Sequence, residues 1–299
     1  MDTPTPAATT TPVETYYRLL YFNTRGAAEP IRYFFAVFNP NNTMPPKTAK
    51  GKGLGPYQDV RYPIQASAKG FGVDSTYLKH QQEGRFRANL DRLPILQIVE
   101  RRRIVASSKE GEGEQSKENS QPAIRIQDVI VGEIGQTHSI LRYLVDRVGG
   151  GSDDPLQRAY VDSFVEAIRD VKTAWFKAKK NQSSSDQPPP RPKDVFLESE
   201  LSEWCQKLEA SLPPTHSSSS SPWLFGHDEP SLADVCLYAM LATPTSLMTG
   251  SSQSFFDGAD AQTVGSSYKD CERLKRSVKA LAEIPSVKRW EQQRPDTFN

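Results

Sequence analysis

The first half of the chain alternates between short apolar strands and helices with an apolar face. Residues 16–22, YYRLLYF, form an apolar run that predicts a buried strand, and residues 26–38 carry apolar side chains at helical spacing. The same patterns predict three more strands, at residues 57–62, 93–99 and 124–134, and two more helices, at residues 74–84 and 137–148. This half of the chain therefore has a mixed α/β pattern.

The second half of the chain has only helical patterns. A long helix is predicted to begin at Asp154 and Pro155 and to end near Lys180. Four further helices are expected, at residues 193–212, 231–242, 270–282 and 286–293. The fold class is thus α/β plus all-α, in two packed domains at residues 14–148 and 155–299, joined by a linker at residues 149–154.

Polar stretches of low complexity separate these elements. We expect a disordered tail at residues 1–13, which are rich in Thr, Pro and Ala. Insertions rich in polar residues, Gly and Pro are expected at residues 39–56, 100–121, 181–192, 215–222 and 250–267. The folded part is therefore expected to be shorter than the 299 residues of the chain.

Composition and charge narrow the classes of partner. The chain carries 37 basic and 36 acidic residues, so nothing indicates a nucleic acid or a membrane surface. No apolar run reaches the ~18 residues that a bilayer span needs. The N-terminal segment lacks the basic and apolar regions of a signal peptide, so we expect a cytoplasmic protein. The cysteines (Cys205, Cys236 and Cys271) have no metal-ligand spacing, so we expect reduced thiols and no metal.

Five segments together carry a family resemblance. In chain order they are YYRLLYFNTRGAAEPIRYFF, NLDRLPILQI, GEIGQTHSILRYLVDRVG, VDSFVEAIRD and WLFGHDEPSLADVCLY. At this spacing they resemble the cytosolic glutathione transferases, and most of all the sigma class with its prostaglandin-D-synthase-type enzymes. The resemblance spans about residues 16–294. It implies a thioredoxin-like N-terminal domain with a mixed four-stranded sheet, a helical C-terminal domain, a homodimer, and glutathione as co-substrate.

Tyr21 is the candidate catalytic residue. The tyrosine that ends the first strand in a Tyr-Phe pair is the catalytic one in the family, and here that pair is Tyr21 and Phe22. A free thiol with a pKa near ~8.5 is only a few per cent thiolate at neutral pH. A phenol that donates a hydrogen bond to the sulfur favours the charged form, and a shift of about two pKa units corresponds to roughly 2.7 kcal/mol. The alternative is a core tyrosine at a strand end.

One position beside Tyr21 departs from the sigma-class pattern. The pattern reads RGRAE, with an arginine that helps to hold the phenol and the thiolate, whereas this chain reads RGAAE and has Ala27 there. Arg25 matches the first arginine of the pattern, which serves either this purpose or the structure. The degree of thiol activation is therefore an open question at this point.

Pro94 opens the third strand of the α/β half. The proline at this point of the family's fold is cis, although X-Pro bonds are usually trans. The resemblance implies that the main chain of Leu93 then pairs with the cysteinyl part of glutathione, as an edge strand pairs with a peptide. Arg92 matches a basic position near the glycyl carboxylate, or else is an exposed loop arginine.

Two further positions match glutathione contacts of the family. Gln136 and Thr137 precede the helix SILRYL and match a Gln-Ser pair that holds the γ-glutamyl carboxylate at a helix N-terminus. Asp170, on the long helix, matches an acidic residue that reaches across the dimer to the partner's ligand. The alternatives are a plain helix cap and a solvated carboxylate.

The last candidates concern folding and the second substrate. Ser231 and Asp234 match the family's helix-capping box, so we expect a structural role and a buried Asp234. A hydrophobic electrophile would lie between the two domains. The candidates for its contacts are Tyr160, Phe164, Trp175 and Phe255.

The resemblance implies conjugation of the glutathione thiolate to hydrophobic electrophiles, a detoxification reaction. The alternatives are a non-catalytic structural or ligand-binding relative on the same fold and a glutathione-dependent isomerase. A cysteine-type relative would need a cysteine near the end of the first strand, and residues 16–29 contain none. A dinucleotide-binding fold is disfavoured because no GxGxxG follows that strand.

Overall fold

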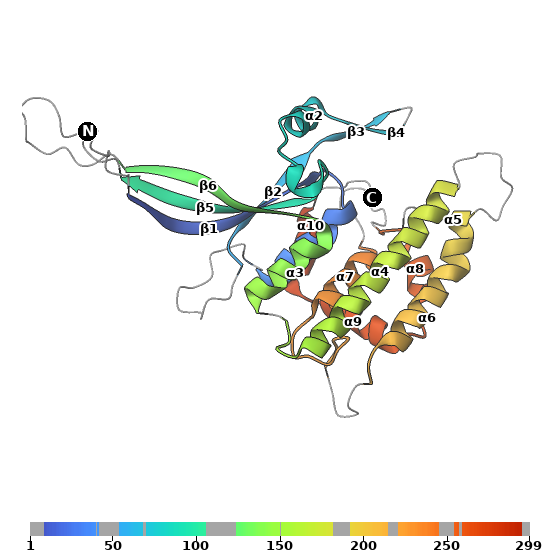
Figure 1. Ribbon diagram of the computed structural model, residues 1–299. Helices are drawn as coiled ribbons and strands as arrows, with labels where there is room; N and C mark the ends of the chain where they lie inside the picture. The colour runs from blue at the N-terminus through green and yellow to red at the C-terminus, as the bar shows by residue number, and fades with distance from the viewer. Residues whose placement is uncertain are drawn as a thin grey trace, which may run out of the picture.

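The protein consists of a sheet with flanking helices and a second part built of helices alone (Figure 1). A computed structural model describes residues 9–39, 41, 54–67, 70–105, 124–149, 151–181, 192–214, 221–244, 254–256 and 259–294. The arrangement confirms the predicted fold class. Figure 1 also shows long strands that extend well beyond the rest of the sheet.

The N-terminal part holds a four-stranded mixed sheet in the order β2-β1-β5-β6. Its strands are β1 (Thr9–Phe22), β2 (Tyr57–Tyr62), β5 (Ile95–Val105) and β6 (Ile124–Gly135). β1 pairs parallel with β2 and antiparallel with β5, and β5 pairs antiparallel with β6. A small hairpin of β3 (Ile64–Ser67) and β4 (Gly70–Val73) follows β2. The helices of this part are η1 (Gly26–Ala28), α1 (Glu29–Phe38), α2 (Ser75–Gln82), η2 (Arg87–Asn89) and α3 (Thr137–Val148).

Alternation along β1 decides which side chains face which helices. Successive strand residues point to opposite faces of a sheet. Leu19 and Tyr21 pack in the large core with α1 and α3, whereas Leu20 packs with Tyr77 of α2 and with Phe86 on the other face. Tyr21 therefore ends the strand on the side of the sheet that faces the helical part.

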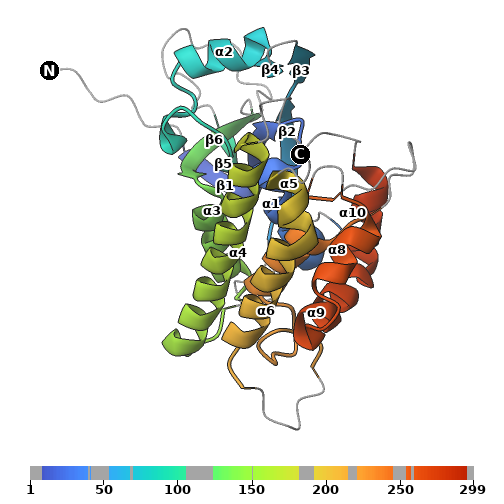
Figure 2. The same cartoon turned by 90° about the vertical axis from the view of Figure 1, so that its right-hand side faces the viewer.

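The C-terminal part consists of helices around the long α4. They are α4 (Pro155–Asn181), α5 (Pro192–Val195), the π-turn η3 (Phe196–Glu200), α6 (Leu201–Ser211), α7 (Leu232–Leu241), α8 (Ala261–Ser267), α9 (Glu272–Ala282) and α10 (Pro285–Gln293). α7 is buried along its whole length and packs against α4 and α9. Figure 2 shows α4 and α6 side by side, with α9 and α10 to their right.

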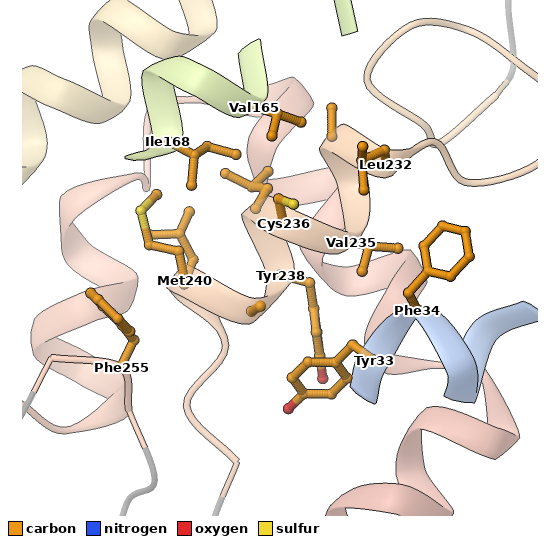
Figure 3. Packing of buried hydrophobic residues seen from close by; sticks show 14 of the residues in the cluster. Tyr33, Phe34, Val165, Ile168, Leu232, Val235, Cys236, Tyr238, Met240 and Phe255 are labelled. Carbon is orange, nitrogen blue, oxygen red and sulfur yellow. The ribbon is translucent and has the colours of Figure 1, made fainter. Parts of the chain in front are cut away.

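The two parts share one core. Tyr33 of α1 and Tyr238 of α7 lie edge to face (Figure 3), with ring centroids 5.1 Å apart. Both hydroxyls donate to the carboxylate of Glu291 on α10. The Arg294 guanidinium, just after α10, forms a buried ion pair with Glu29 of α1. These contacts join α1 to α7 and α10, so the relative position of the two parts is fixed by packing.

The extended strands correct two predictions. Residues 9–13, predicted as part of a disordered tail, belong to β1, and residues 100–105, predicted as part of an insertion, belong to β5. Polar composition concealed these strands because their charges pair across the sheet: Arg101 contacts both Glu14 and Asp128. A register shift between Pro12 and Glu14 accommodates the proline, which has no N–H to donate.

The predicted insertion at residues 250–267 is also partly ordered secondary structure. Residues 261–267 form α8, and the side chain of Asp260 caps it by accepting from the Thr263 N–H at 2.7 Å. Phe256 is fully buried against Trp175 and Phe196. The polar, Gly-containing sequence of this insertion thus gave no indication of the short helix α8 or of the buried Phe256 that precedes it.

The other predicted insertions fall wholly or partly outside the described residues. Residues 1–8, 42–53, 106–121, 182–191 and 215–220 lie there. The end of the first insertion is described, and there the buried Asn39 side chain donates to the carbonyl oxygens of Leu54 and Gly55. The described part of the predicted linker, residue 149 and residues 151–154, lies between α3 and α4.

Candidate active site

Tyr21 reaches an open cleft between the two parts of the molecule. The cleft has a volume of about 700 Å³. One wall comes from the end of β1, the turn to α1 and the start of α3, and the other comes from α4 and Phe255. The lining residues are Tyr21, Phe22, Thr24, Gly26, Ala27, Pro30, Ile64, Val73, Gln136, Thr137, His138, Ser139, Arg142, Glu166, Arg169, Lys172, Thr173, Phe176 and Phe255.

The turn after β1 fixes the Tyr21 hydroxyl. The N–H of Ala27 donates to the phenolic oxygen at 2.9 Å, and the guanidinium of Arg32 lies 5.7 Å from the ring centroid. Because the oxygen accepts from the backbone, the proton of the hydroxyl remains available for donation. The side chain is only 9% exposed, so the phenol is held in one position at the edge of the cleft.

Gly26 permits the close approach between this turn and the phenol. Its φ is +37°, and a Cβ built on it would lie 2.5 Å from the Tyr21 oxygen. An L side chain is strained at such a φ by roughly 1–2 kcal/mol, and the added carbon would also displace the hydroxyl. The glycine of the NTRG turn is therefore required by the geometry of Tyr21.

We expect Gly26→Ala to reduce any activity that depends on Tyr21 by about tenfold in kcat/KM, since small misplacements of a reacting group are costly. Steady-state kinetics of the wild type and the variant measure this change in kcat/KM. The matched control is Gly265→Ala, because an added Cβ at Gly265 meets nothing within 4 Å. Equal activity of the two variants would contradict a role for Gly26 in placing the phenol.

The peptide bond between Leu93 and Pro94 is cis, as expected. The side-chain amide of the buried Asn89 donates to the Pro94 carbonyl at 3.0 Å and so braces this bend. Leu93 is half-buried, and Arg92 is exposed. None of Arg92, Leu93 and Pro94 lines the cleft itself, and their contact with glutathione stays a prediction.

The start of α3 differs from the prediction in detail. Gln136, not Thr137, occupies the N-cap position, with φ of +67°, and makes no side-chain cap. Its amide instead donates to the Asn89 side chain at 2.7 Å. The Thr137 hydroxyl donates to the Ala27 carbonyl at 2.9 Å, which ties α3 to the turn beside Tyr21. Both residues line the cleft, so the N-terminus of α3 lies next to the phenol.

The face of α4 that lines the cleft is rich in charge. Glu166 pairs with Arg142 at 2.9 Å, with Arg169 at 2.9 Å and with His138 at 3.2 Å. Burial lowers the pKa of His138, while Glu166 acts in the opposite direction. Lys172 lies one turn further along, with its ammonium 4.9 Å from the ring centroid of Phe255. This wall is therefore polar at one end and aromatic at the other.

Three of the four residues predicted to contact the electrophile lie elsewhere. Phe164 and Trp175 are 3% and 1% exposed and belong to the core, and Tyr160 is exposed and does not line the cleft. Phe255 does line it. The exposed Asp170 is also absent from the lining, and its predicted reach across a dimer stays a prediction.

Several cleft residues were missed by the sequence analysis. They are His138, Glu166, Arg169, Lys172, Thr173 and Phe176. The available signal was spacing: positions 166, 169, 173 and 176 recur at three and four residues beside the apolar stripe of the long helix. A search for the helix face next to that stripe would have found them.

The capping box at the start of α7 is confirmed. The side chain of Ser231 accepts from the Asp234 N–H, and the Asp234 carboxylate accepts from the Ser231 N–H at 2.8 Å. Asp234 is completely buried and also accepts from the Leu224 N–H and the Ser277 hydroxyl. This pair holds the helical part together and lies outside the cleft.

Two other features are absent from the described ranges. There, no group of three or more His, Cys, Asp or Glu side chains is placed to hold a metal ion. Across the same residues, no helix combines the length and the apolar character that a bilayer crossing requires. A second, smaller cavity of about 230 Å³ lies between α3, α4 and the start of α7, and Tyr21 is not among its lining residues.

Sequence comparison finds one family and one curated relative. Residues 169–294 match the family model described as "Glutathione S-transferase, C-terminal domain". Glutathione S-transferase 4 of Caenorhabditis elegans is 29% identical over 154 residues, which cover 52% of this chain. The match spans 45% of the length of that relative, which is less than half.

Solved structures share the fold over nearly the whole chain. Monomeric Na-GST-3, a glutathione S-transferase of the hookworm Necator americanus, matches with a TM-score of 0.57 at 18% identity, over 94% of this chain and 98% of its own. Prostaglandin synthase D of Nilaparvata lugens matches with a TM-score of 0.53 at 14% identity, over 94% of this chain and all of its own.

Other matched structures are named as Nu-class and Pi-class enzymes, so the structural matches do not single out the sigma class. At these identities the structural matches establish the fold, and the family model adds the sequence pattern of the C-terminal domain. The chain therefore has the fold of these glutathione S-transferases, with a thioredoxin-like N-terminal part and a helical C-terminal part, and its residues 169–294 match the sequence pattern of their C-terminal domain.

Proposed function

We propose that this protein is a glutathione transferase in which Tyr21 stabilises the thiolate of bound glutathione for attack on a hydrophobic electrophile. One observation carries the proposal. The Tyr21 oxygen accepts a hydrogen bond from the Ala27 N–H at the edge of an open cleft, which leaves the phenolic proton for a sulfur atom.

The chemistry needs little else from the protein. A phenolic hydrogen bond to sulfur favours the thiolate over the thiol, and the thiolate is the nucleophile. With the electrophile in the same cleft, the reaction becomes effectively unimolecular. The thiolate then forms a carbon–sulfur bond, and the leaving group departs with the electron pair of the bond that breaks.

The N-terminus of α3 suits the γ-glutamyl carboxylate. The first hydrogen bond within the helix runs from the Ile140 N–H to the Gln136 carbonyl, so the amides of residues 137–139 point out of the helix. Such amides attract carboxylates. In the proposed complex Gln136 and Thr137 bind this group, Leu93 pairs through its main chain beside the cis Pro94, and Arg92 lies near the glycyl carboxylate.

The remaining features of the proposal follow the family resemblance. They are a sigma-like class, a cytoplasmic homodimer and a contact from Asp170 to the ligand of the partner subunit. The relative from Necator americanus is named as monomeric, so the oligomeric state of this chain is an independent question.

Two alternatives keep specific support. Ala27 is exposed in the cleft where the sigma-class pattern has an arginine, which favours a non-catalytic relative. The matched enzyme from Nilaparvata lugens is named as a prostaglandin synthase, which favours an isomerase. Neither alternative includes conjugation, and of the two only the isomerase requires glutathione to bind.

Binding and turnover together test the proposal. We expect glutathione to bind, 1-chloro-2,4-dinitrobenzene to be conjugated, and the ultraviolet thiolate band of bound glutathione to titrate well below the ~8.5 of a free thiol. S-Methylglutathione is the control, because it should bind without showing that band. Binding without conjugation of any aryl chloride would favour the alternatives, and an empty cleft at millimolar glutathione would refute both the main proposal and the isomerase.

A further inference from the structure

Lys172 is the one cationic side chain lining the cleft that has no carboxylate partner among the described residues. The other two, Arg142 and Arg169, are paired: Arg142 with Asp162 and Glu166, and Arg169 with Glu166. The ammonium of Lys172 instead lies 4.9 Å from the ring centroid of Phe255. The positive charge of Lys172 therefore lies against an aromatic ring and has no ion-pair partner among the described residues.

No carboxylate in the described part of the chain forms an ion pair with Lys172. Burial lowers the pKa of Lys172, and Cys236 and Glu29 act in the opposite direction. Burial raises the pKa of the Cys236 thiol to about 12, so this thiol is neutral at physiological pH. Glu29 is itself paired with Arg32 and Arg294. A half-buried cation without a carboxylate partner is unfavourable, and an anionic ligand would relieve that cost.

Lys172 lies among apolar surfaces. Pro30, Phe176 and Phe255 line the same cleft, with Ile64 and Val73 from the small hairpin. Phe176 is more than half exposed, and its ring lies edge to face with Phe255 at 5.8 Å. The volume of about 700 Å³ is within the range of sites for drug-sized ligands. An apolar wall with one unpaired cation matches a ligand with an apolar body and one negative group.

We propose that Lys172 is a specificity-determining residue that selects, for the second-substrate part of the cleft, apolar molecules bearing a carboxylate. This proposal rests on the proposed function in that it treats the ligand as a substrate. The preference for anionic ligands does not depend on that function. Lys172 binds the carboxylate, and Phe176 and Phe255 contact the apolar body. It is not a catalytic residue, because it takes no part in forming the thiolate.

A matched pair of electrophiles tests the selectivity. Glutathione displaces chloride from 4-chloro-3-nitrobenzoate and from 4-chloro-3-nitrobenzamide by the same reaction, and the two differ in charge at one group. We expect the wild-type protein to prefer the benzoate by at least about tenfold in kcat/KM, mostly through KM. Lys172→Met should abolish this preference, and Lys172→Arg should retain it.

Lys177→Met is the matched control. Lys177 lies on the same helix, is exposed and does not line the cleft, so its loss removes one positive charge without touching the proposed site. It should keep the wild-type preference. A preference that is absent in the wild type, or that Lys177→Met reduces as much as Lys172→Met does, would overturn the proposal.

Binding without turnover separates the two proposals. Calorimetry with dodecanoate and with dodecanamide measures the charge preference in a protein that need not be an enzyme. A preference for dodecanoate that depends on Lys172, in a protein that conjugates neither aryl chloride, would sustain the anionic site and refute the proposed function. A Lys172→Met variant that loses glutathione affinity and keeps its dodecanoate affinity would assign the lysine to glutathione and overturn the inference.

Discussion

Replacement of Tyr21 with phenylalanine should raise the pKa of glutathione bound in the cleft by about two units and reduce conjugation at neutral pH by up to about 100-fold. The phenylalanine ring keeps the packing of Tyr21 in the core and removes only the hydroxyl. Glutathione affinity should change little, because its carboxylates and main chain supply most of the contacts. Ultraviolet titration of the bound thiol measures the pKa, and steady-state kinetics measure the turnover.

Tyr16→Phe is the matched control for this experiment. Tyr16 lies on the same strand and is also buried, and its hydroxyl donates to Asp128 at 2.9 Å, away from the cleft. Its loss should leave the pKa of the bound thiol unchanged. If Tyr21→Phe left that pKa unchanged as well, the phenol would have no part in the activation of the thiol, whatever the effect on turnover.

If glutathione bound to the wild-type protein had the pKa of a free thiol, the absence of an arginine at position 27 would explain it. The N–H of Ala27 orients the phenol, but its methyl group supplies no positive charge where the sigma-class pattern has an arginine. The ring of Tyr21 has Arg32 at 5.7 Å, and this guanidinium is engaged by Asp59 and the Thr24 carbonyl. In the proposed mechanism, thiol activation therefore depends on the hydrogen bond from Tyr21 more than on a neighbouring charge.

Much of the fold could be predicted because local patterns and the family resemblance agree. The strand with Tyr21 next to its last residue, the cis Pro94 and the helix that starts at Thr137 were all expected, and each is present. The extension of β1 and β5 could not be read from apolar pattern, because both faces of that ribbon are solvated. Ion pairs such as Arg101 with Glu14 hold it, and these become visible only once the register is known.

The second-substrate wall was less predictable, for a reason that lies in α4. Phe164, Ile168, Val171 and Trp175 repeat at four, three and four residues and form its buried stripe. Aromatic residues on such a stripe pack in the core, so Phe164 and Trp175 were poor candidates. The cleft takes the face next to the stripe, where Lys172 and its neighbours look like ordinary solvated positions until the N-terminal part is packed against them.

The largest loss of stability is expected from Asp234→Ala. The buried carboxylate accepts from the N–H groups of Leu224 and Ser231 and from the hydroxyls of Ser231 and Ser277, at 2.6 to 2.9 Å. Alanine would leave the two N–H groups without an acceptor, and each unsatisfied buried donor costs about 1–3 kcal/mol. With the loss of the helix cap, the free energy of unfolding should fall by about 3–5 kcal/mol, measured by urea denaturation.

Two further variants distinguish the contribution of the Asp234 carboxylate to stability from that of neighbouring groups. Ser277→Ala removes one donor and leaves the carboxylate in place, so it should cost only about 1 kcal/mol. Asp270→Ala removes an exposed carboxylate from the same part of the molecule and should change the free energy of unfolding by no more than about 0.5 kcal/mol.

Because Asp234 fastens the loop at Leu224 and the helix α9 to the start of α7, its loss should lower stability without changing the pKa of bound glutathione in the molecules that remain folded. An Asp234→Ala protein as stable as Ser277→Ala would mean that water or a local shift satisfies these donors, and that the capping box contributes far less than its geometry indicates.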